Sequence, residues 1–307
     1  MILLTAVTLQ GPRLGVKTSA GVVILDQAAK NKKSLPLTIG QALSEPDGLD
    51  RVREVVRANL SDAETLRKLA VPESEIELGS LFQPTNVLCI GLNYKDHAAE
   101  SGLPLPEKPV MFAKLTRCVT GPGAPIVLPP DTNEVDYEAE LAVVIGRLCR
   151  GVSASEALDY VAGYTCMNDV SARDFQRGDG QWVRAKSQDT FGPMGPYLVT
   201  PEEISGPQSL RIQCRVNGQL LQDSNTDKMI FPVNELIAFI SRGITLEPGD
   251  VISTGTPHGI GAVRKPPVFL KPGDEVVVEI EGLGRLSNSV KAAPMRVSAP
   301  KPAKQYA

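Results

Sequence analysis

The chain has 307 residues, of which 42% are hydrophobic and 22% charged, and its formal net charge is −3. These values are typical of a folded protein and provide no general basic surface, which excludes nucleic acid as the main partner. The sequence contains no run of about 18 apolar residues, so we predict neither a transmembrane span nor a membrane partner.

The first part of the chain predicts a small unit of mixed structure. Two apolar runs flank a turn with glycine and indicate a hairpin, Val16–Thr18 and Val22–Leu25. Apolar residues at helical spacing predict a helix over Asp47–Leu60. A second short helix follows, with Ser61 as the expected cap and Glu64 three residues later in the pattern of a capping box.

From about residue 79 the sequence changes to short apolar runs separated by Gly and Pro. These runs predict strands at Val87–Gly91, Glu138–Gly146, Arg211–Val216, Val251–Thr254 and Glu275–Ile280. Asn217-Gly218 indicates a hairpin turn. Ser153–Tyr160 predicts a helix with a capping box. We therefore expect a small N-terminal domain over 1–78, a strand-rich catalytic domain over 79–295 and a disordered tail over 296–307.

Glu138 and Glu140 are separated by one residue at the start of an apolar strand. On a strand, such side chains project from the same face, where two carboxylates repel each other. A divalent cation relieves this repulsion, and oxygen ligands favour Mg²⁺, Mn²⁺ or Ca²⁺. The alternative is a solvated acidic edge. Asp169 follows the nearly apolar segment 160–167, which suits either a ligand at the end of a buried element or a turn cap.

One of the two histidines has a carboxylate one helical turn away. His97 and Glu100 would lie on one helix face, where the carboxylate can orient the imidazole as a general base. The alternative is a surface pair of little energetic consequence. His258, in TGTPHGIG, is expected to be a loop residue. Lys186 could stabilise negative charge beside a cation, or it could be a solvated side chain.

The five cysteines are widely spaced and form no C-x-x-C pair. This pattern predicts reduced, buried thiols in an intracellular protein. Cytoplasmic localisation is the default expectation, with the mitochondrial matrix as the alternative.

Five motifs, in order, resemble those of the fumarylacetoacetate hydrolase superfamily. They are GLNYKDHAAE (91–100), EVDYEAELAVVIG (134–146), MNDVSARDFQ (167–176), AKSQDTFGP (185–193) and TGTPHGIG (254–261). The stretch VRKPPVFLKPGDEVVVEIEGLG (263–284) is similar to the fumarylacetoacetate hydrolase domain-containing protein 2 group. The resemblance implies an α+β fold, a mixed β-sandwich roll preceded by a small N-terminal α/β unit, and a homodimer.

The resemblance also implies roles for individual residues. It implies that the metal ligands are Glu138, Glu140 and Asp169. It makes His97 and Glu100 a base dyad on a segment that closes over the substrate.

Four further residues match family positions around the substrate. Lys186 matches a lysine that contacts the oxo-carboxylate end of the substrate. Arg173, Gln176 and Thr256 match residues that line the pocket, although Arg173 could instead form an ion pair with Asp174.

These features predict a divalent-metal-dependent hydrolase, with Mg²⁺ as the first choice, that cleaves a C–C bond in a small 2,4-dioxo acid such as an acylpyruvate. His97 would deprotonate the attacking water, and the cation and Lys186 would stabilise the departing enolate. The alternative is keto–enol tautomerisation or decarboxylation of oxaloacetate, since these reactions also pass through an enolate. A non-catalytic metal-binding scaffold is the third possibility, and intact carboxylates, base and lysine argue against it.

Overall fold

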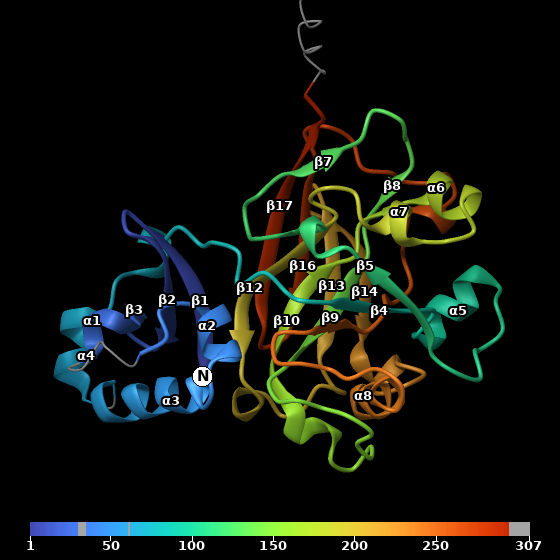
Figure 1. The fold of residues 1–307 in the computed structure, drawn as a ribbon. Helices are drawn as coiled ribbons and strands as arrows, with labels where there is room; N and C mark the ends of the chain where they lie inside the picture. Colours follow the sequence, from blue (N-terminus) through green and yellow to red (C-terminus); the bar gives the residue numbers. More distant parts are fainter. Residues whose placement is uncertain (30–34, 61, 295–307) are drawn as a thin grey trace, which may run out of the picture.

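A large mixed sheet runs through the protein (Figure 1), and the computed structural model describes it within residues 1–29, 35–60 and 62–294. Its strand order is β3-β2-β1-β12-β10-β9-β15-β4-β5, and β6 pairs with β12. The strands are β1 (Ile2–Thr8), β2 (Gly11–Thr18), β3 (Gly21–Ile24), β4 (Val87–Gly91), β5 (Val110–Lys114), β6 (Val119–Thr120), β9 (Ala139–Ile145), β10 (Val161–Asn168), β12 (Gly192–Val199) and β15 (Val251–Ser253). The predicted N-terminal hairpin and the strands near residues 87, 138 and 251 are therefore confirmed.

A second sheet packs against the first in the order β14-β13-β16-β17-β7, and β8 pairs with β11. These strands are β7 (Ile126–Leu128), β8 (Val135–Asp136), β11 (Ser171–Ala172), β13 (Arg211–Val216), β14 (Gln219–Asn225), β16 (Glu275–Ile280) and β17 (Gly284–Ala292). The turn between β13 and β14 has positive φ at Asn217 and Gly218, at 51° and 78°. Both residue types tolerate this conformation, which confirms the predicted hairpin.

Strand β9 is buried along its whole length and separates two apolar cores. Leu141, Val143 and Ile145 belong to the core shared with the second sheet. Ala142 and Val144 belong to the core on the opposite face. This alternation follows from the two-residue period of a strand, which turns successive side chains of β9 toward opposite faces of the sheet.

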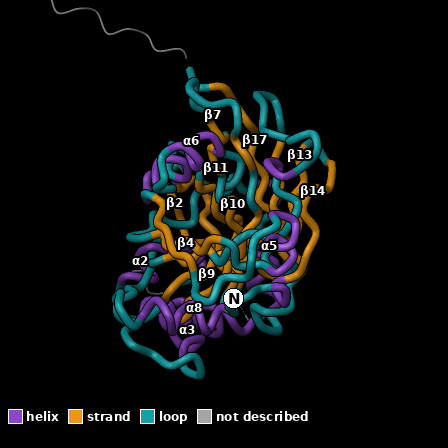
Figure 2. Tube along the Cα trace, turned by 90° about the vertical axis from the view of Figure 1, so that its right-hand side faces the viewer, coloured by secondary structure: helices purple, strands orange, loops and turns teal. Residues whose placement is uncertain are grey.

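The helices surround the sheets. They are α1 (Leu25–Ala28), α2 (Ile39–Ser44), α3 (Gly48–Asn59), α4 (Ala63–Leu69), α5 (Lys95–Ser101), α6 (Arg173–Gly178), α7 (Val183–Lys186) and α8 (Val233–Ser241). In two perpendicular views α3 and α8 lie toward the lower end of the molecule and α6 toward the upper end (Figures 1 and 2). The described residues include no helix that is long and apolar enough to cross a membrane.

The N-terminal segment continues the large sheet, because β1 pairs with β12 through Ile2↔Val199 and Leu3↔Leu198. Residues of this segment also share an apolar core with β9, β10 and β15. A boundary at residue 78 therefore stays a prediction.

Two local expectations need comment. The helix predicted over Ser153–Tyr160 is wrong: the chain forms only a 3₁₀ turn at Ala157–Tyr160. The expected contact between Ser153 and Glu156 does form, but the backbone bonds from Glu156 to Ser153 and from Asp159 to Glu156 span three residues, which forms turns and not an α-helix. Helix α4 forms where the second short helix was predicted, but its cap is Asp62, whose carboxylate accepts a bond from the N–H of Thr65. Ser61 and the tail over 296–307 lie outside the described residues.

Replacing a leucine of β9 should test how much this central strand contributes to stability. Leu141 is 0% exposed, whereas Leu148, just beyond the strand, is 64% exposed. We expect Leu141→Ala to lower the free energy of unfolding by about 2–5 kcal/mol, because it removes buried methyl groups and leaves a cavity. The matched variant Leu148→Ala should change it by less than about 0.5 kcal/mol. Urea denaturation measures both, and equal losses would contradict the central position of β9.

Candidate active site

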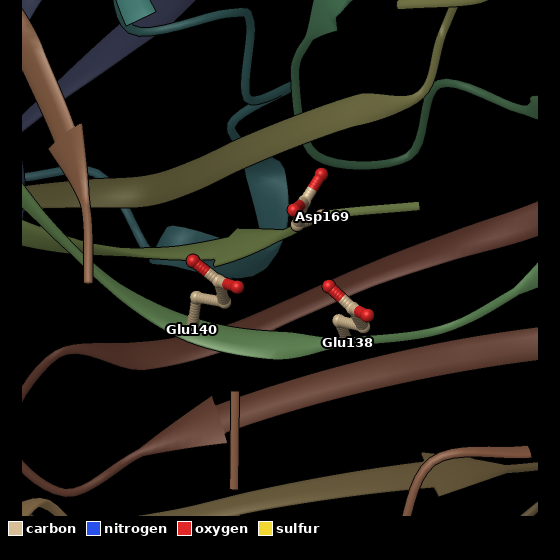
Figure 3. Close-up of side chains that lie close together, drawn as sticks. All are labelled: Glu138, Glu140 and Asp169. Atoms are coloured by element: carbon tan, nitrogen blue, oxygen red, sulfur yellow. The ribbon is translucent and has the colours of Figure 1, made fainter. Parts of the chain in front are cut away.

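Three carboxylates meet at one end of β9 and β10. Glu138 and Glu140 project from the same face of their strand, and Asp169 approaches from the neighbouring strand (Figure 3). The pairing of the strands explains this arrangement, because Met167 of β10 lies opposite Glu140, and the N–H of Asp169 donates to the carbonyl of Glu138 at 2.9 Å. One oxygen from each carboxylate lies within 4.8 Å of the others, and all three residues are buried.

Buried cations surround these acids. The Nζ of Lys186, on α7, lies 2.7 Å from a Glu138 oxygen and 2.7 Å from an Asp169 oxygen. The Nζ of Lys114, at the end of β5, lies 2.6 Å from the other Asp169 oxygen. Lys114 was not among the predicted site residues, because a lysine that ends the apolar run VMFA can equally reach solvent.

A buried guanidinium joins the same network. Arg173, at the start of α6, lies 2.6 Å from Glu138 and 2.9 Å from Asp136. The expected alternative partner, Asp174, instead accepts bonds from Thr132 and from the N–H of Phe175. Arg173 is thus an ion-pair residue, but its partners belong to the acidic cluster.

The two glutamates differ in their electrostatic surroundings. Burial raises the pKa of Glu138, but Lys186 and Arg173 outweigh this effect and lower the pKa to about 2. Burial, Asp169 and Glu138 together raise the pKa of Glu140 well above its ordinary value. Glu140 accepts bonds from Ser253 and from the N–H of Gly255, and these do not neutralise its charge. The ionised form of Glu140 therefore requires a further positive charge nearby.

The geometry of the three acids fits a hard divalent cation. Oxygen ligands lie about 2.0–2.6 Å from Mg²⁺ or Ca²⁺, so two oxygens on one ion are at most about 5 Å apart. The separations within 4.8 Å meet this limit. The acids also provide only oxygen donors, which suits Mg²⁺, Mn²⁺ or Ca²⁺.

The acids open into a pocket of about 400 Å³ that brings most of the predicted site together. The predicted residues that line it are His97, Glu138, Glu140, Asp169, Arg173, Gln176, Lys186 and Thr256. Its apolar wall includes Phe112 and Trp182, whose rings pack edge to face with centroids 5.2 Å apart.

Of the predicted site residues, Glu100 alone lies outside this pocket lining, and the lining residues make further polar contacts. The Nδ1 of His97 lies 2.7 Å from Glu100. Gln176 accepts a bond from Arg173. The Thr256 hydroxyl donates to the carbonyl of Ala139. His258 lies in a loop, as expected, where its ring contacts Asp96.

Comparisons with known proteins give this site a family. The family model described as fumarylacetoacetate (FAA) hydrolase C-terminal matches residues 86–291. The chain is 44% identical over 286 residues, covering 92% of this chain and 88% of the relative, to a *Bos taurus* protein named oxaloacetate tautomerase FAHD2B, mitochondrial.

Two solved structures agree with this match. The fumarylacetoacetate hydrolase of *Exiguobacterium antarcticum* is 35% identical with a TM-score of 0.79, covering 95% of this chain and all of the other. The maleylpyruvate hydrolase of *Sphingobium* sp. SYK-6, solved in complex with manganese (II) ion and pyruvate, is 28% identical with a TM-score of 0.75, covering 96% of this chain and all of the other. The homodimer and the cytoplasmic setting stay predictions. The chain belongs to the fumarylacetoacetate hydrolase family.

Proposed function

We propose that the protein interconverts the keto and enol forms of oxaloacetate, with a divalent cation held by Glu138, Glu140 and Asp169. The observation that carries this proposal is that these acids, His97 and Lys186 line the same pocket. The name of the bovine relative, an oxaloacetate tautomerase, supports this reaction over the hydrolysis that was our first expectation. The relative of *Sphingobium*, which holds manganese and pyruvate, supports a cation and a 2-oxo acid in such a pocket.

The charge of the site suits an anionic substrate. Four buried carboxylates (Asp136, Glu138, Glu140 and Asp169) lie among three buried cations (Lys114, Arg173 and Lys186). This set is one positive charge short of balance, and a divalent cation would leave it with one net positive charge. A small dicarboxylate such as oxaloacetate supplies the negative charge that this surplus attracts.

His97 is the proposed base. The Nδ1 of His97 lies 2.7 Å from Glu100. An ionised carboxylate only accepts hydrogen bonds, so this contact places the proton of the neutral ring on Nδ1 and leaves Nε2 free to take a proton. In the keto-to-enol direction, Nε2 removes a proton from C3, the C3–H electron pair forms the C2–C3 double bond, and the C2=O π pair moves onto the 2-oxo oxygen. That oxygen takes a proton from water, and the imidazolium returns its proton to solvent. In the reverse direction the 2-hydroxyl loses its proton to water, and protonated His97 donates a proton to C3.

Lys186 stabilises the negative charge that develops on the 2-oxo oxygen. An ammonium group has three N–H donors, and two of them point to Glu138 and Asp169. The third is available to the substrate. A divalent cation bound by the three acids would supply a Lewis acid that withdraws electrons from the 2-oxo group.

Tautomerisation needs fewer parts than hydrolysis. Hydrolysis of a 2,4-dioxo acid requires, in addition, a water held against the distal carbonyl while the base removes its proton. The described residues supply a base, a cation site and a lysine, which are sufficient for proton transfer at C3. Hydrolysis of an acylpyruvate is therefore the second candidate.

Removing one of the proposed metal ligands should weaken metal binding and lower activity. We expect Glu138→Gln and Glu140→Gln each to weaken Mn²⁺ binding at least about tenfold, because a neutral amide replaces a charged ligand. Mn²⁺ titration followed by electron paramagnetic resonance measures binding, and the ultraviolet absorbance of the oxaloacetate enol measures activity, with EDTA as the metal-free reference. Glu64→Gln is the matched control, since Glu64 forms an exposed pair with Lys68 on α4 and does not line the pocket. Unchanged Mn²⁺ binding in both ligand variants would contradict the proposed site.

Removing the base should separate catalysis from metal binding. We expect His97→Gln to lower kcat by about 10²–10⁴-fold and to leave Mn²⁺ affinity unchanged. Glu100→Gln should have a smaller effect, because the amide oxygen can still accept a hydrogen bond from Nδ1–H.

A substrate panel with the wild-type protein and Mg²⁺ distinguishes the reactions. It follows oxaloacetate enol absorbance, acylpyruvate absorbance and pyruvate release in parallel. Turnover of acylpyruvate alone would favour a hydrolase over a tautomerase, and no turnover in any assay would favour a metal-binding scaffold.

A further inference from the structure

The helix that carries His97 needs support from the rest of the protein. Helix α5 has only seven residues, and a helix of this length is not stable in isolation. It lies at the edge of the molecule, away from the N-terminal helices (Figure 1). The segment that follows it exposes Leu103 and Leu105, which are 53% and 54% accessible. Its one buried residue is Ala98, so the bonds that its side chains make contribute much of what holds α5 in place.

Asp96, in the first turn of α5, makes several such bonds. Its carboxylate lies 3.0 Å from the Nδ1 of His258 and also accepts a bond from the hydroxyl of Ser224, on β14. The backbone N–H of His258 lies 3.4 Å from its other oxygen. We refer to Asp96, Ser224 and His258 as the latch. One turn later, Glu100 accepts a bond from the N–H of Gly259 at 2.8 Å.

The loop that receives α5 is itself attached to the acidic cluster. In the segment 254–262, the N–H of Gly255 donates to Glu140 at 3.0 Å. The N–H groups of Gly261 and Ala262 donate to Asp136 at 2.7 and 3.0 Å. The loop thus bonds on one side to the carboxylates of the cluster and on the other side to the helix that carries the base.

Two glycines show how closely this loop fits its surroundings. Gly255 and Gly259 have φ of +98° and +97°, a conformation that favours glycine. A Cβ on Gly259 would lie 2.2 Å from the carbonyl oxygen of Leu221, and a Cβ on Gly255 would lie 2.7 Å from the Cβ of Asn93. A loop so closely packed is a fixed support for α5.

We infer that Asp96 is a positioning residue, which holds α5 through His258 and Ser224 so that His97 faces the cations and acids of the pocket. The latch does not touch the substrate; it acts through the placement of the helix. The effect on turnover rests on the proposed function, whereas the effect on the helix itself does not.

Hydrogen exchange of the full-length protein tests the latch directly. We expect Asp96→Asn and His258→Ala each to speed amide exchange in residues 95–101 about tenfold, because each removes the side-chain contact between Asp96 and His258 from a helix with one buried residue. His258 has a 44% exposed side chain, so its removal should not impair folding. Asp223→Asn is the control, since Asp223 precedes Ser224 on β14 and pairs with Arg211. It should leave exchange in residues 95–101 unchanged.

Kinetics and metal binding distinguish positioning from a general structural role. In both latch variants we expect kcat for oxaloacetate to fall about tenfold, with Mn²⁺ affinity and Tm unchanged. Unchanged exchange in residues 95–101 in both variants would overturn the inference, and so would faster exchange spread over the whole chain. If the wild-type protein does not turn over oxaloacetate, the proposed function fails, and the exchange experiment still decides whether the latch holds α5.

Discussion

Burying several carboxylates together is the constraint on which the rest of this structure depends. Ionised acids lose their hydration when buried, and they remain charged only where cations or hydrogen-bond donors compensate. Glu138 and Asp169 obtain this compensation from Lys114, Arg173 and Lys186, which come from separate parts of the chain. Glu140 accepts bonds from Ser253 and from the N–H of Gly255. The cluster can therefore form only when β5, β9, β10 and α7 are in their final places, and the fold and the site depend on each other.

The sheet holds the three carboxylates rigidly, whereas α5 and α7 carry His97 and Lys186. Residues 139–145 of β9 are entirely buried between two cores, so the carboxylates at its start have little freedom to move. His97, the proposed base, lies on α5, outside these cores, where polar bonds contribute to fixing its place. Rigidly held carboxylates and a separately held histidine would suit the proposed proton transfer, because the two parts of the site are positioned independently.

The sequence predicted what depends on local periodicity and missed what depends on distant contacts. Alternation on a strand was sufficient to place Glu138 and Glu140 on one face. Lys114 was missed because its partner Asp169 is 55 residues away, and no local pattern separates a buried lysine from one that reaches solvent. The helix expected over 153–160 does not form because the backbone bonds there span three residues rather than four. Hydrolysis and tautomerisation use the same residues and differ in the placement of a water, which no sequence pattern records.

The composition of the pocket wall has a practical consequence for studying ligands. Trp182 is the single tryptophan of the chain, and it lines the pocket beside Phe112. Fluorescence excited at the red edge of the indole band therefore arises from one ring, at the place where substrate and cation would bind. Its intensity and wavelength depend on the polarity and charge around that ring. The native protein thus contains its own optical probe of the site, and binding can be followed without a label or an introduced fluorophore.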